Sequence, residues 1–261
     1  MSRTFDCNNP GERSRGISAA VRAVRRGKLV VLPTDTVYGI GCDAFNQDAV
    51  AALQSAKGRG SNKPPPVLVG STATLPGISA QSGGLVKKLT EAFWPGGLTI
   101  VCREQPSLKW NLGDTFGTVA VRMPLHPVAI EVLKQTGPMA VSSANVTGKP
   151  PSRTAAEAKE QLGESVAVYL ESFPSEDLVA STIVDVTADP PRVLREGAVS
   201  LETLREVVPA VIGVGEEPAS APGGDPSADT SETAEEGDGR ADPEGSNGAE
   251  QDDARTSESN R

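Results

Sequence analysis

The feature that most constrains the fold is the stretch over residues 29–43, which reads LVVLPTDTVYGIGCD. It begins with four apolar residues, Leu29 to Leu32, a pattern that is typical of a strand buried on both faces. Pro33 ends this strand, because proline has no N–H to donate to a sheet. The polar residues Thr34, Asp35 and Thr36 then follow at the carboxyl end of the strand, where open α/β sheets bind their ligands. The stretch therefore predicts a core strand that leads into a binding loop, with an ordinary turn as the alternative.

Helical and strand-like patterns alternate through most of the chain. The helical periodicity predicts helices over residues 16–26, 47–56, 85–93, 128–135, 155–162 and 201–208. Short apolar runs predict strands over residues 29–32, 67–69, 98–102, 118–121, 139–142, 166–170, 182–186 and 193–194. This alternation predicts an α/β domain built on a mixed sheet. We expect the domain to cover residues 13–210, after a flexible N-terminus over residues 1–12.

Acidic residues are concentrated at the C-terminal end of the chain. Residues 216–261 hold 14 acidic and 3 basic residues, whereas the first 215 residues hold 20 acidic and 22 basic ones. The formal net charge of −9 therefore comes from the last segment. This segment has no periodic apolar pattern and is rich in Glu, Asp, Ser, Gly, Pro and Ala, so it cannot bury enough surface to offset its ordering entropy. We predict a disordered acidic tail over residues 211–261.

Several classes of protein are disfavoured by the sequence. The three cysteines, Cys7, Cys42 and Cys102, have no paired spacing, so neither a disulfide framework nor a zinc site is indicated. His126 is the one histidine and stands at a predicted helix start, where we expect a structural role. No apolar run approaches the roughly 20 residues that cross a bilayer, and the first residues lack a hydrophobic signal core. We expect a cytoplasmic protein that does not bind membranes.

Lys57 and Arg59 flank a glycine, and Lys63 follows closely. Cations beside glycine suit a polyphosphate, because they neutralise charge while glycine allows close approach of the backbone. The alternative is a solvated basic loop. The chain has neither GxGxxG nor GxxxxGK[ST], so a nucleotide would have to be bound by other means.

Further polar residues stand at the ends of predicted strands. The segment 142–145, Ser-Ser-Ala-Asn, could donate to phosphate or carboxylate oxygens, or could form a turn or helix cap. Arg122 follows the apolar run 119–121, where it would form either a structural ion pair or a fork for a carboxylate, and Arg195 has the same two interpretations. No nucleophile elbow or Cys–His pair is present. We therefore expect chemistry by positioning and electrostatics.

Seven segments, in this order along the chain, resemble the YrdC-like family, the threonylcarbamoyl-AMP synthases of tRNA modification. The resemblance as a whole spans roughly residues 16–208, nearly all of the predicted domain. The matching segments are residues 33–39, 57–59, 94–99, 119–124, 143–145, 181–185 and 194–197.

The resemblance implies an α/β fold with a YrdC-like twisted mixed sheet, flanked by helices around an open, concave, electropositive cleft. It also implies that L-threonine, bicarbonate and ATP give L-threonylcarbamoyladenylate and pyrophosphate, with Mg²⁺ as a cofactor. A partner threonylcarbamoyl transferase complex would then modify the adenosine beside the anticodon of tRNAs that read ANN codons. Such a reaction needs in-line placement and charge neutralisation but no protein nucleophile.

The matching motifs also imply roles for individual residues. The L-threonine site would contain Thr34, Arg122 and Ser181, with Arg122 suited to the carboxylate. The ATP site would contain Lys57, Arg59, Thr118, Ser143, Asn145, Ser152 and Arg195. In one departure, family members often have a histidine in a strand that reads PLIVHV, whereas this chain ends the corresponding segment with Gly70. In another, some members carry a folded C-terminal domain where this chain has its acidic segment, so we expect the single-domain form.

Two other functions compete with the synthase. One is a non-catalytic RNA-binding module with a basic cleft, since the first 215 residues have a slight basic excess and the fold could accept nucleic acid with weak affinity. The other is the carbamoyl-transfer domain of a hydrogenase-maturation factor. The acylphosphatase-like and zinc-finger segments expected beside that domain are absent from this sequence.

Overall fold

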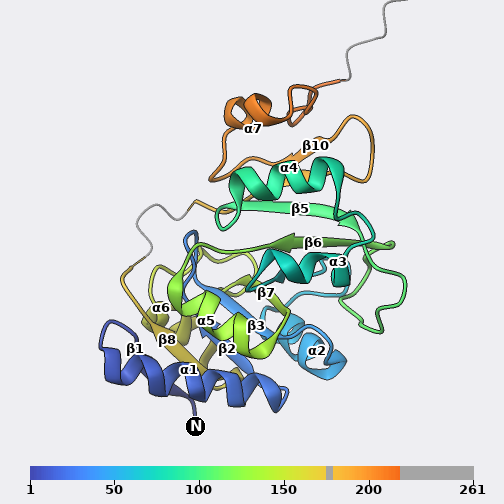
Figure 1. Cartoon of the computed structure of the whole chain (residues 1–261). Coiled ribbons are helices and arrows are strands. Elements are labelled where there is room, and N and C mark those ends of the chain that lie inside the picture. The colour runs from blue at the N-terminus through green and yellow to red at the C-terminus, as the bar shows by residue number, and fades with distance from the viewer. Residues whose placement is uncertain (175–178, 218–261) are drawn as a thin grey trace, which may run out of the picture. The chain divides into compact units, whose positions relative to one another are not determined.

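The computed structural model describes residues 1–174 and 179–217, which form a ten-stranded sheet flanked by helices (Figure 1). The predicted twisted mixed sheet is thereby confirmed. The strands are β1 (Arg3–Asp6), β2 (Leu29–Leu32), β3 (Gly39–Asp43), β4 (Val67–Leu68), β5 (Leu98–Arg103), β6 (Thr118–Arg122), β7 (Met139–Ser143), β8 (Val166–Glu171), β9 (Thr182–Asp185) and β10 (Arg192–Arg195). The helices are α1 (Pro10–Arg25), α2 (Gln47–Ala56), α3 (Leu75–Ile78), α4 (Gly84–Phe93), α5 (Pro127–Thr136), α6 (Ala155–Leu162) and α7 (Leu201–Val207), with the 3₁₀ turns η1 (Thr72–Thr74) and η2 (Gly163–Ser165). Within the described ranges, no helix combines the length and apolar character that crossing a membrane requires.

The strands follow the order β1-β8-β2-β3-β7-β4-β6-β5-β9-β10. The pairs β1/β8, β2/β8, β4/β6 and β5/β9 are parallel. The pairs β2/β3, β3/β7, β4/β7, β5/β6 and β9/β10 are antiparallel. Neighbours in the sheet are therefore often distant in the sequence, as β3 and β7 are. This order places segments that the sequence analysis singled out beside one another.

The two faces of the sheet are covered unequally. On one face, α1 and α5 pack over strands β1, β8, β2, β3 and β7 (Figure 1). The other face is covered by α2, α3, α4, α6 and α7. In β6, Val119 and Val121 are buried under this second layer, whereas Ala120, on the first face, is only half-buried. Its cross-strand partner Val101 is half-buried too. The first face is therefore left partly open over β6 and β5, and this opening forms the cleft.

The N-terminal region differs from the prediction of a flexible segment over residues 1–12. Strand β1 pairs in parallel with β8, and Phe5 is buried in the core. Helix α1 starts at Pro10 rather than at residue 16, because the side chain of Asn9 caps it by accepting from the backbone N–H groups of Gly11 and Glu12. Proline suits the first turn of a helix, where its missing N–H has no partner to lose.

Strand β3 occupies residues for which the sequence predicts a loop. It contains two glycines, Gly39 and Gly41, which disfavour a strand. Here each glycine faces Val141 of β7, and a Cβ atom built on either one would lie 2.6 or 2.8 Å from a methyl carbon of that valine. Glycine is therefore required by the close approach of β3 to β7.

The folded region extends beyond residue 210. Val211 and Ile212 are buried, and Ile212 forms a β-bridge with Arg192. Glu216 forms an ion pair with Arg205 and accepts from the backbone N–H of Gly213. The predicted boundary at residue 211 therefore lies too early. The rest of the predicted acidic tail, residues 218–261, lies outside the described residues.

Candidate active site

A cavity of about 560 Å³ lies where the open face of the sheet meets the loop after β2. We call it the central cavity, and its size is typical of a small-molecule site. Four of its described lining residues are cations and none is a carboxylate, so the cavity favours anionic ligands. Its lining comprises Thr34, Thr36, Val37, Tyr38, Gly39, Arg59, Lys63, Pro64, Pro66, Leu68, Thr99, Arg122, Val141, Ser142, Ser143, Pro151, Ala180, Ser181, Ile183 and Arg195.

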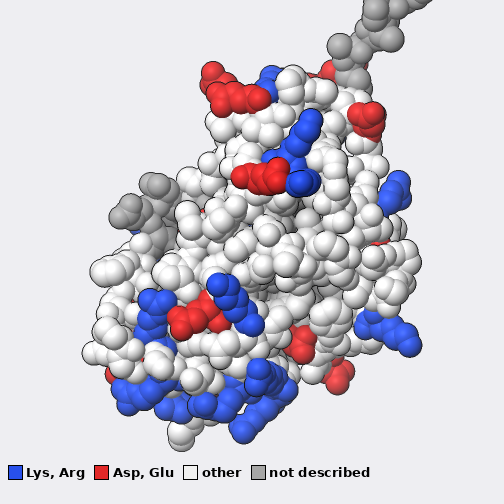
Figure 2. Space-filling view, viewed as in Figure 1, with Lys and Arg blue, Asp and Glu red and all other residues white. Residues whose placement is uncertain are grey.

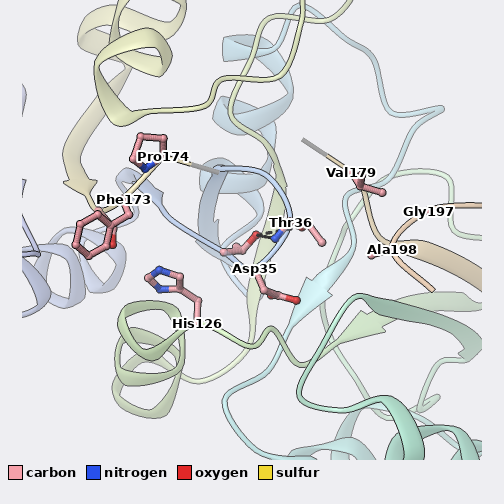
Figure 3. A pocket seen from close by; sticks show the side chains of 10 residues that line it. Asp35, Thr36, His126, Phe173, Pro174, Val179, Gly197 and Ala198 are labelled. Carbon is pink, nitrogen blue, oxygen red and sulfur yellow. Dashed lines mark hydrogen bonds between the residues drawn. The ribbon is translucent and has the colours of Figure 1, made fainter. Parts of the chain in front are cut away.

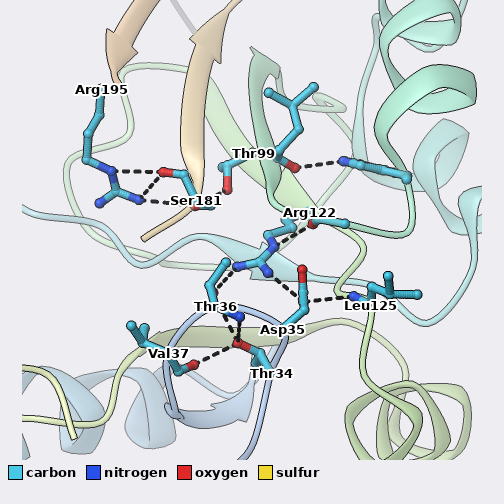
Figure 4. A network of polar contacts seen from close by, with 12 residues as sticks. Thr34, Asp35, Thr36, Val37, Thr99, Arg122, Leu125, Ser181 and Arg195 are labelled. Atoms are coloured by element: carbon cyan, nitrogen blue, oxygen red, sulfur yellow. Dashed lines mark hydrogen bonds and ion pairs between the residues drawn. The ribbon is translucent and has the colours of Figure 1, made fainter. Parts of the chain in front are cut away.

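Arg122 is held at the end of β6 by three different groups (Figure 4). Its Nη2 donates to Oδ1 of Asp35 at 2.6 Å, and its Nε donates to the carbonyl of Gly96 at 2.9 Å. Its Nη1 donates to the hydroxyl of Thr36 at 2.8 Å. Burial lowers the pKa of Arg122, and the neighbouring Asp35 opposes this shift. The structural ion pair is therefore confirmed, and Arg122 also lines the cavity, where a fork for a ligand carboxylate stays a prediction.

Thr34 and Thr36 extend this network in one direction. The hydroxyl of Thr34 donates to the carbonyl of Val37 at 2.7 Å and accepts from the backbone N–H of Thr36 at 3.2 Å. Since its proton is used in this way, the contact of 3.1 Å between the two threonine hydroxyls is a donation from Thr36 to Thr34. The Thr34 hydroxyl is therefore already satisfied, and it shapes the loop rather than offering a free donor.

Ser181 and Arg195 form the opposite wall of the cavity (Figure 4). Arg195 donates to the carbonyl of Ser181 through Nε at 3.0 Å and through Nη2 at 2.7 Å. The Ser181 hydroxyl lies 2.8 Å from the hydroxyl of Thr99. No hydrogen bond from Nη1 of Arg195 to a described residue is found, so this nitrogen can serve a ligand.

Arg59 differs from the other two arginines of the cavity. Its Nε and Nη2 atoms are buried and make no hydrogen bond within the described part of the chain. Burial lowers the pKa of the guanidinium, since no carboxylate offsets the desolvation. A buried donor without a partner is costly, and a bound anion would remove that cost.

The structure contradicts a loop position for Lys57. This residue is 2% exposed, caps the C-terminus of α2 and does not line the cavity. Its Nζ donates to the carbonyls of Ser143 and Asn145 at 2.5 and 2.7 Å. Burial, and next to it the charge of Arg59, lower the pKa of Lys57 to about 8. Lys57 therefore ties α2 to the segment that follows β7.

Of the other predicted ATP residues, one lines the cavity, two are buried behind its wall and one lies away from it. Ser143 lines the cavity. Asn145 and Ser152 are buried behind it, where the Ser152 hydroxyl donates to the carbonyl of Ala144 and Nδ2 of Asn145 donates to that of Lys149. The Oδ1 atom of Asn145 is buried without a partner among the described residues. Thr118 lies at the far end of β6 from Arg122 and does not line the cavity.

Sequence reasoning missed several lining residues. Thr99 and Leu68 are not among the site residues expected from the sequence, although their cross-strand partners Ile183 and Arg122 also line the cavity. Strand β4, in the segment where the sequence departs from the family it resembles, faces the cavity with Leu68. Gly70 cannot do so, because a Cβ there would lie 2.7 Å from the backbone nitrogen of Lys134 in α5.

A second cavity of about 540 Å³ shares Thr34 and Thr36 with the first and also contains Asp35 and His126 (Figure 3). Nδ1 of His126 accepts from the backbone N–H of Val128, which confirms the expected position at a helix start. Burial lowers the pKa of His126, so the neutral imidazole that accepts this bond is favoured.

Comparison with known proteins gives four findings. The family model of the Sua5, YciO and YrdC proteins, described as "Telomere recombination", matches residues 22–197. A putative threonylcarbamoyl-AMP synthase of Mycobacterium tuberculosis (strain H37Rv) is 58% identical over 208 residues, which cover 80% of this chain and 96% of the relative. Among solved structures, Pyrococcus abyssi Sua5 complexed with L-threonine has a TM-score of 0.76 and 30% identity, over 85% of this chain and 67% of that one. Escherichia coli YciO has a TM-score of 0.70 and 24% identity, over 78% of this chain and 99% of that one, and it supports the fold alone.

Proposed function

This chain belongs to the Sua5, YciO and YrdC family, and we propose on that premise that it is a threonylcarbamoyl-AMP synthase, an enzyme of the transferase class. Its reaction joins L-threonine, bicarbonate and ATP into L-threonylcarbamoyladenylate and releases pyrophosphate. The product serves tRNA modification, through a partner transferase that acts on tRNAs reading ANN codons. The cytoplasmic location expected from the sequence is part of this proposal.

The observation that carries the proposal is the charge of the central cavity. Arg59, Lys63, Arg122 and Arg195 line it without any carboxylate from the described lining residues. Threonine and ATP together bring one carboxylate and a triphosphate, which need several cations in a confined space. Arg59 supports the triphosphate site best, because its buried Nε and Nη2 atoms have no hydrogen-bond partner among the residues that the structure describes.

We assign the L-threonine site to Arg122 and Ser181. We add Arg195, which the resemblance implied for ATP, because its guanidinium donates to the carbonyl of Ser181. Each terminal nitrogen of Arg122 carries two N–H groups and uses one of them inside the protein. The remaining two can meet a carboxylate as a fork. The Pyrococcus abyssi relative was solved with L-threonine, which supports an amino-acid site in this fold. Thr34 then contributes by shaping the loop beside the ligand.

The chemistry follows from this placement. The threonine amine attacks bicarbonate and, with loss of water, forms a carbamate. An oxygen of the carbamate then attacks the α-phosphorus of ATP, and pyrophosphate leaves with the P–O bond electrons. The chain contributes alignment and neutralisation of the phosphate charge. Mg²⁺ would enter with ATP, since the described lining of the cavity offers it hydroxyls but no carboxylate.

The direct test follows pyrophosphate release from the purified full chain with L-threonine, bicarbonate and MgATP. Release should require all three substrates and should fall when L-serine or L-valine replaces L-threonine. Pyrophosphate release without threonine or bicarbonate would refute the synthase. Salt-sensitive binding of RNA in the cavity, with no release under any condition, would favour the RNA-binding module instead.

A further inference from the structure

Exposed basic side chains gather over α1, outside the central cavity (Figure 2). We call this surface the α1 basic face. It comprises Arg15, Arg22, Arg25, Arg26 and Lys28 of α1 and the turn after it, and Lys134 of the adjacent α5. None of these six residues lines either cavity.

The spacing of the arginines aligns them along the helix. Arg15, Arg22 and Arg26 are seven and four residues apart, so they lie within roughly 40° of one another around the axis and span about 16 Å along it. The opposite side of α1 is fixed in the core by Ile17, Ala20 and other buried residues. Nη2 of Arg25 donates to the carbonyl of Gln135 at 2.9 Å and so joins α1 to α5. The cations therefore stand on a rigid support.

Few acidic groups balance this charge. Arg15 lies 3.7 Å from Glu12, and the nearby Glu131 is paired with Arg13 at 3.0 Å. Among the described residues, no ion pair is formed by Arg22, Arg26, Lys28 or Lys134. The face therefore keeps an excess of positive charge that is open to solvent.

We propose that the α1 basic face binds the phosphate backbone of RNA. Guanidinium groups fit phosphate oxygens with two donors, and aligned cations suit a regular row of phosphates. None of the large exposed apolar side chains lies on α1. A membrane-bound helix would need such side chains, and so would the core of a protein interface. The choice of RNA also rests on the proposed function, because that product is consumed by transfer to an RNA adenosine.

The test compares three forms of the full chain for binding to an unmodified tRNA transcript by fluorescence anisotropy. These are the native chain, the R22A/R25A/R26A variant, and a K87A/K88A/K109A control that removes three exposed lysines elsewhere. The arginine variant should bind roughly tenfold more weakly at moderate salt. Its slope of log affinity against log salt should fall by about 2 to 3, as expected for three lost phosphate contacts. The control should bind like the native chain.

Two further measurements separate the possible failures. Pyrophosphate release should be equal in all three forms. If no form released pyrophosphate, the proposed function would be refuted, whereas the measured difference in RNA binding would still hold. An R22E/R26E variant, which keeps the Arg25 bond to α5, should bind even more weakly while melting like the native chain. Equal RNA binding by the native chain and the arginine variant would overturn the inference. So would a native chain that binds polyglutamate or phosphatidylserine vesicles through these arginines but does not bind RNA.

Discussion

The three arginines of the central cavity are prepared for ligands in different ways. Arg122 and Arg195 are fixed by neighbours before any substrate arrives, Arg122 by Asp35, Thr36 and Gly96. Arg59 has two buried nitrogens that make no hydrogen bond to residues 1–174 or 179–217. Fixed donors suit the small carboxylate, whose position decides whether the amine reaches bicarbonate. The unsatisfied arginine suits the nucleotide, whose binding removes the cost of the buried charge.

Substituting Arg59 separates the stability cost of its unsatisfied donors from its role in nucleotide binding. In Arg59→Met the apolar stem is kept and the two unsatisfied donors are lost, so the unliganded protein should gain about 1 kcal/mol and melt roughly 2–4 °C higher. The rate of pyrophosphate release should fall on the order of 10²-fold. Thermal melting and turnover, measured on one preparation, check the predicted rise in melting temperature and the predicted fall in rate. Arg103→Met, an exposed arginine on β5, is the control and should change neither. A lower melting temperature for Arg59→Met would contradict the absence of partners.

Asp35 is expected to act through Arg122. In Asp35→Ala the acceptor for Nη2 of Arg122 and for the backbone N–H of Leu125 is removed, so the guanidinium loses its orientation. The KM for L-threonine should rise roughly tenfold or more, which is the worth of a hydrogen bond to a charged group. In Asp35→Asn one oxygen acceptor is kept, so the KM should stay close to native although the lost charge lowers the melting temperature. Steady-state kinetics over threonine concentration decide this, and equal KM values for the two variants would argue against positioning.

At the scale of elements, the sequence predicts structure wherever local pattern and tertiary packing agree. The apolar run of β2 is buried throughout, as expected. Strand β3 could not be predicted, because glycine disfavours strands and only the partners β2 and β7 make its pairing favourable. The motifs also indicated which segments converge on the cavity. They could not show that the amine of Lys57 turns inward to backbone carbonyls, because side-chain direction depends on packing between distant segments.

The inward position of Lys57 means that its loss should destabilise the fold, which a solvated basic loop would not predict. Lys57→Met leaves the carbonyls of Ser143 and Asn145 without their donor, at a cost of about 1–3 kcal/mol for each buried acceptor. The melting temperature should therefore fall clearly, and activity should fall with it because Ser143 shifts. Lys87→Met on α4 is the exposed control. A native melting temperature with lost activity would restore a direct role in ATP binding.

The same lysine predicts a dependence of stability on pH. Its pKa is lowered from 10.5 to about 8 in the folded chain, so between these values the unfolded chain holds the proton more tightly. The free energy of unfolding should therefore rise with pH from about 8 to about 10.5 through this group. Burial raises the pKa of Cys7, Cys42 and Cys102, which lowers stability above about pH 9, but these groups are common to both proteins. Urea unfolding across this range should therefore show a stability difference, native minus Lys57→Met, that rises with pH. Parallel curves for the two proteins would mean that the folded amine titrates normally.

At the scale of the whole molecule, the chain divides into a domain that carries the site and a long acidic segment. The family match covers residues 22–197, whereas the described fold begins with β1 and continues to residue 217. Both segments outside the matched region belong to the sheet, because β1 pairs with β8 and Ile212 forms a β-bridge with Arg192. The boundary of the functional unit therefore lies outside the matched region at both ends.

Two shortened chains test the C-terminal boundary. A chain that ends at Glu217 loses nine net negative charges but no described contact, so its melting temperature and pyrophosphate release should match those of the full chain. A chain that ends at Gly215 also loses Glu216, which pairs with Arg205, accepts from the N–H of Gly213 and accepts from Arg192 through its carbonyl. Because the ion pair is exposed, the melting temperature should fall only slightly, with turnover unchanged. A lower melting temperature already in the chain ending at Glu217 would show that residues 218–261 contribute to stability.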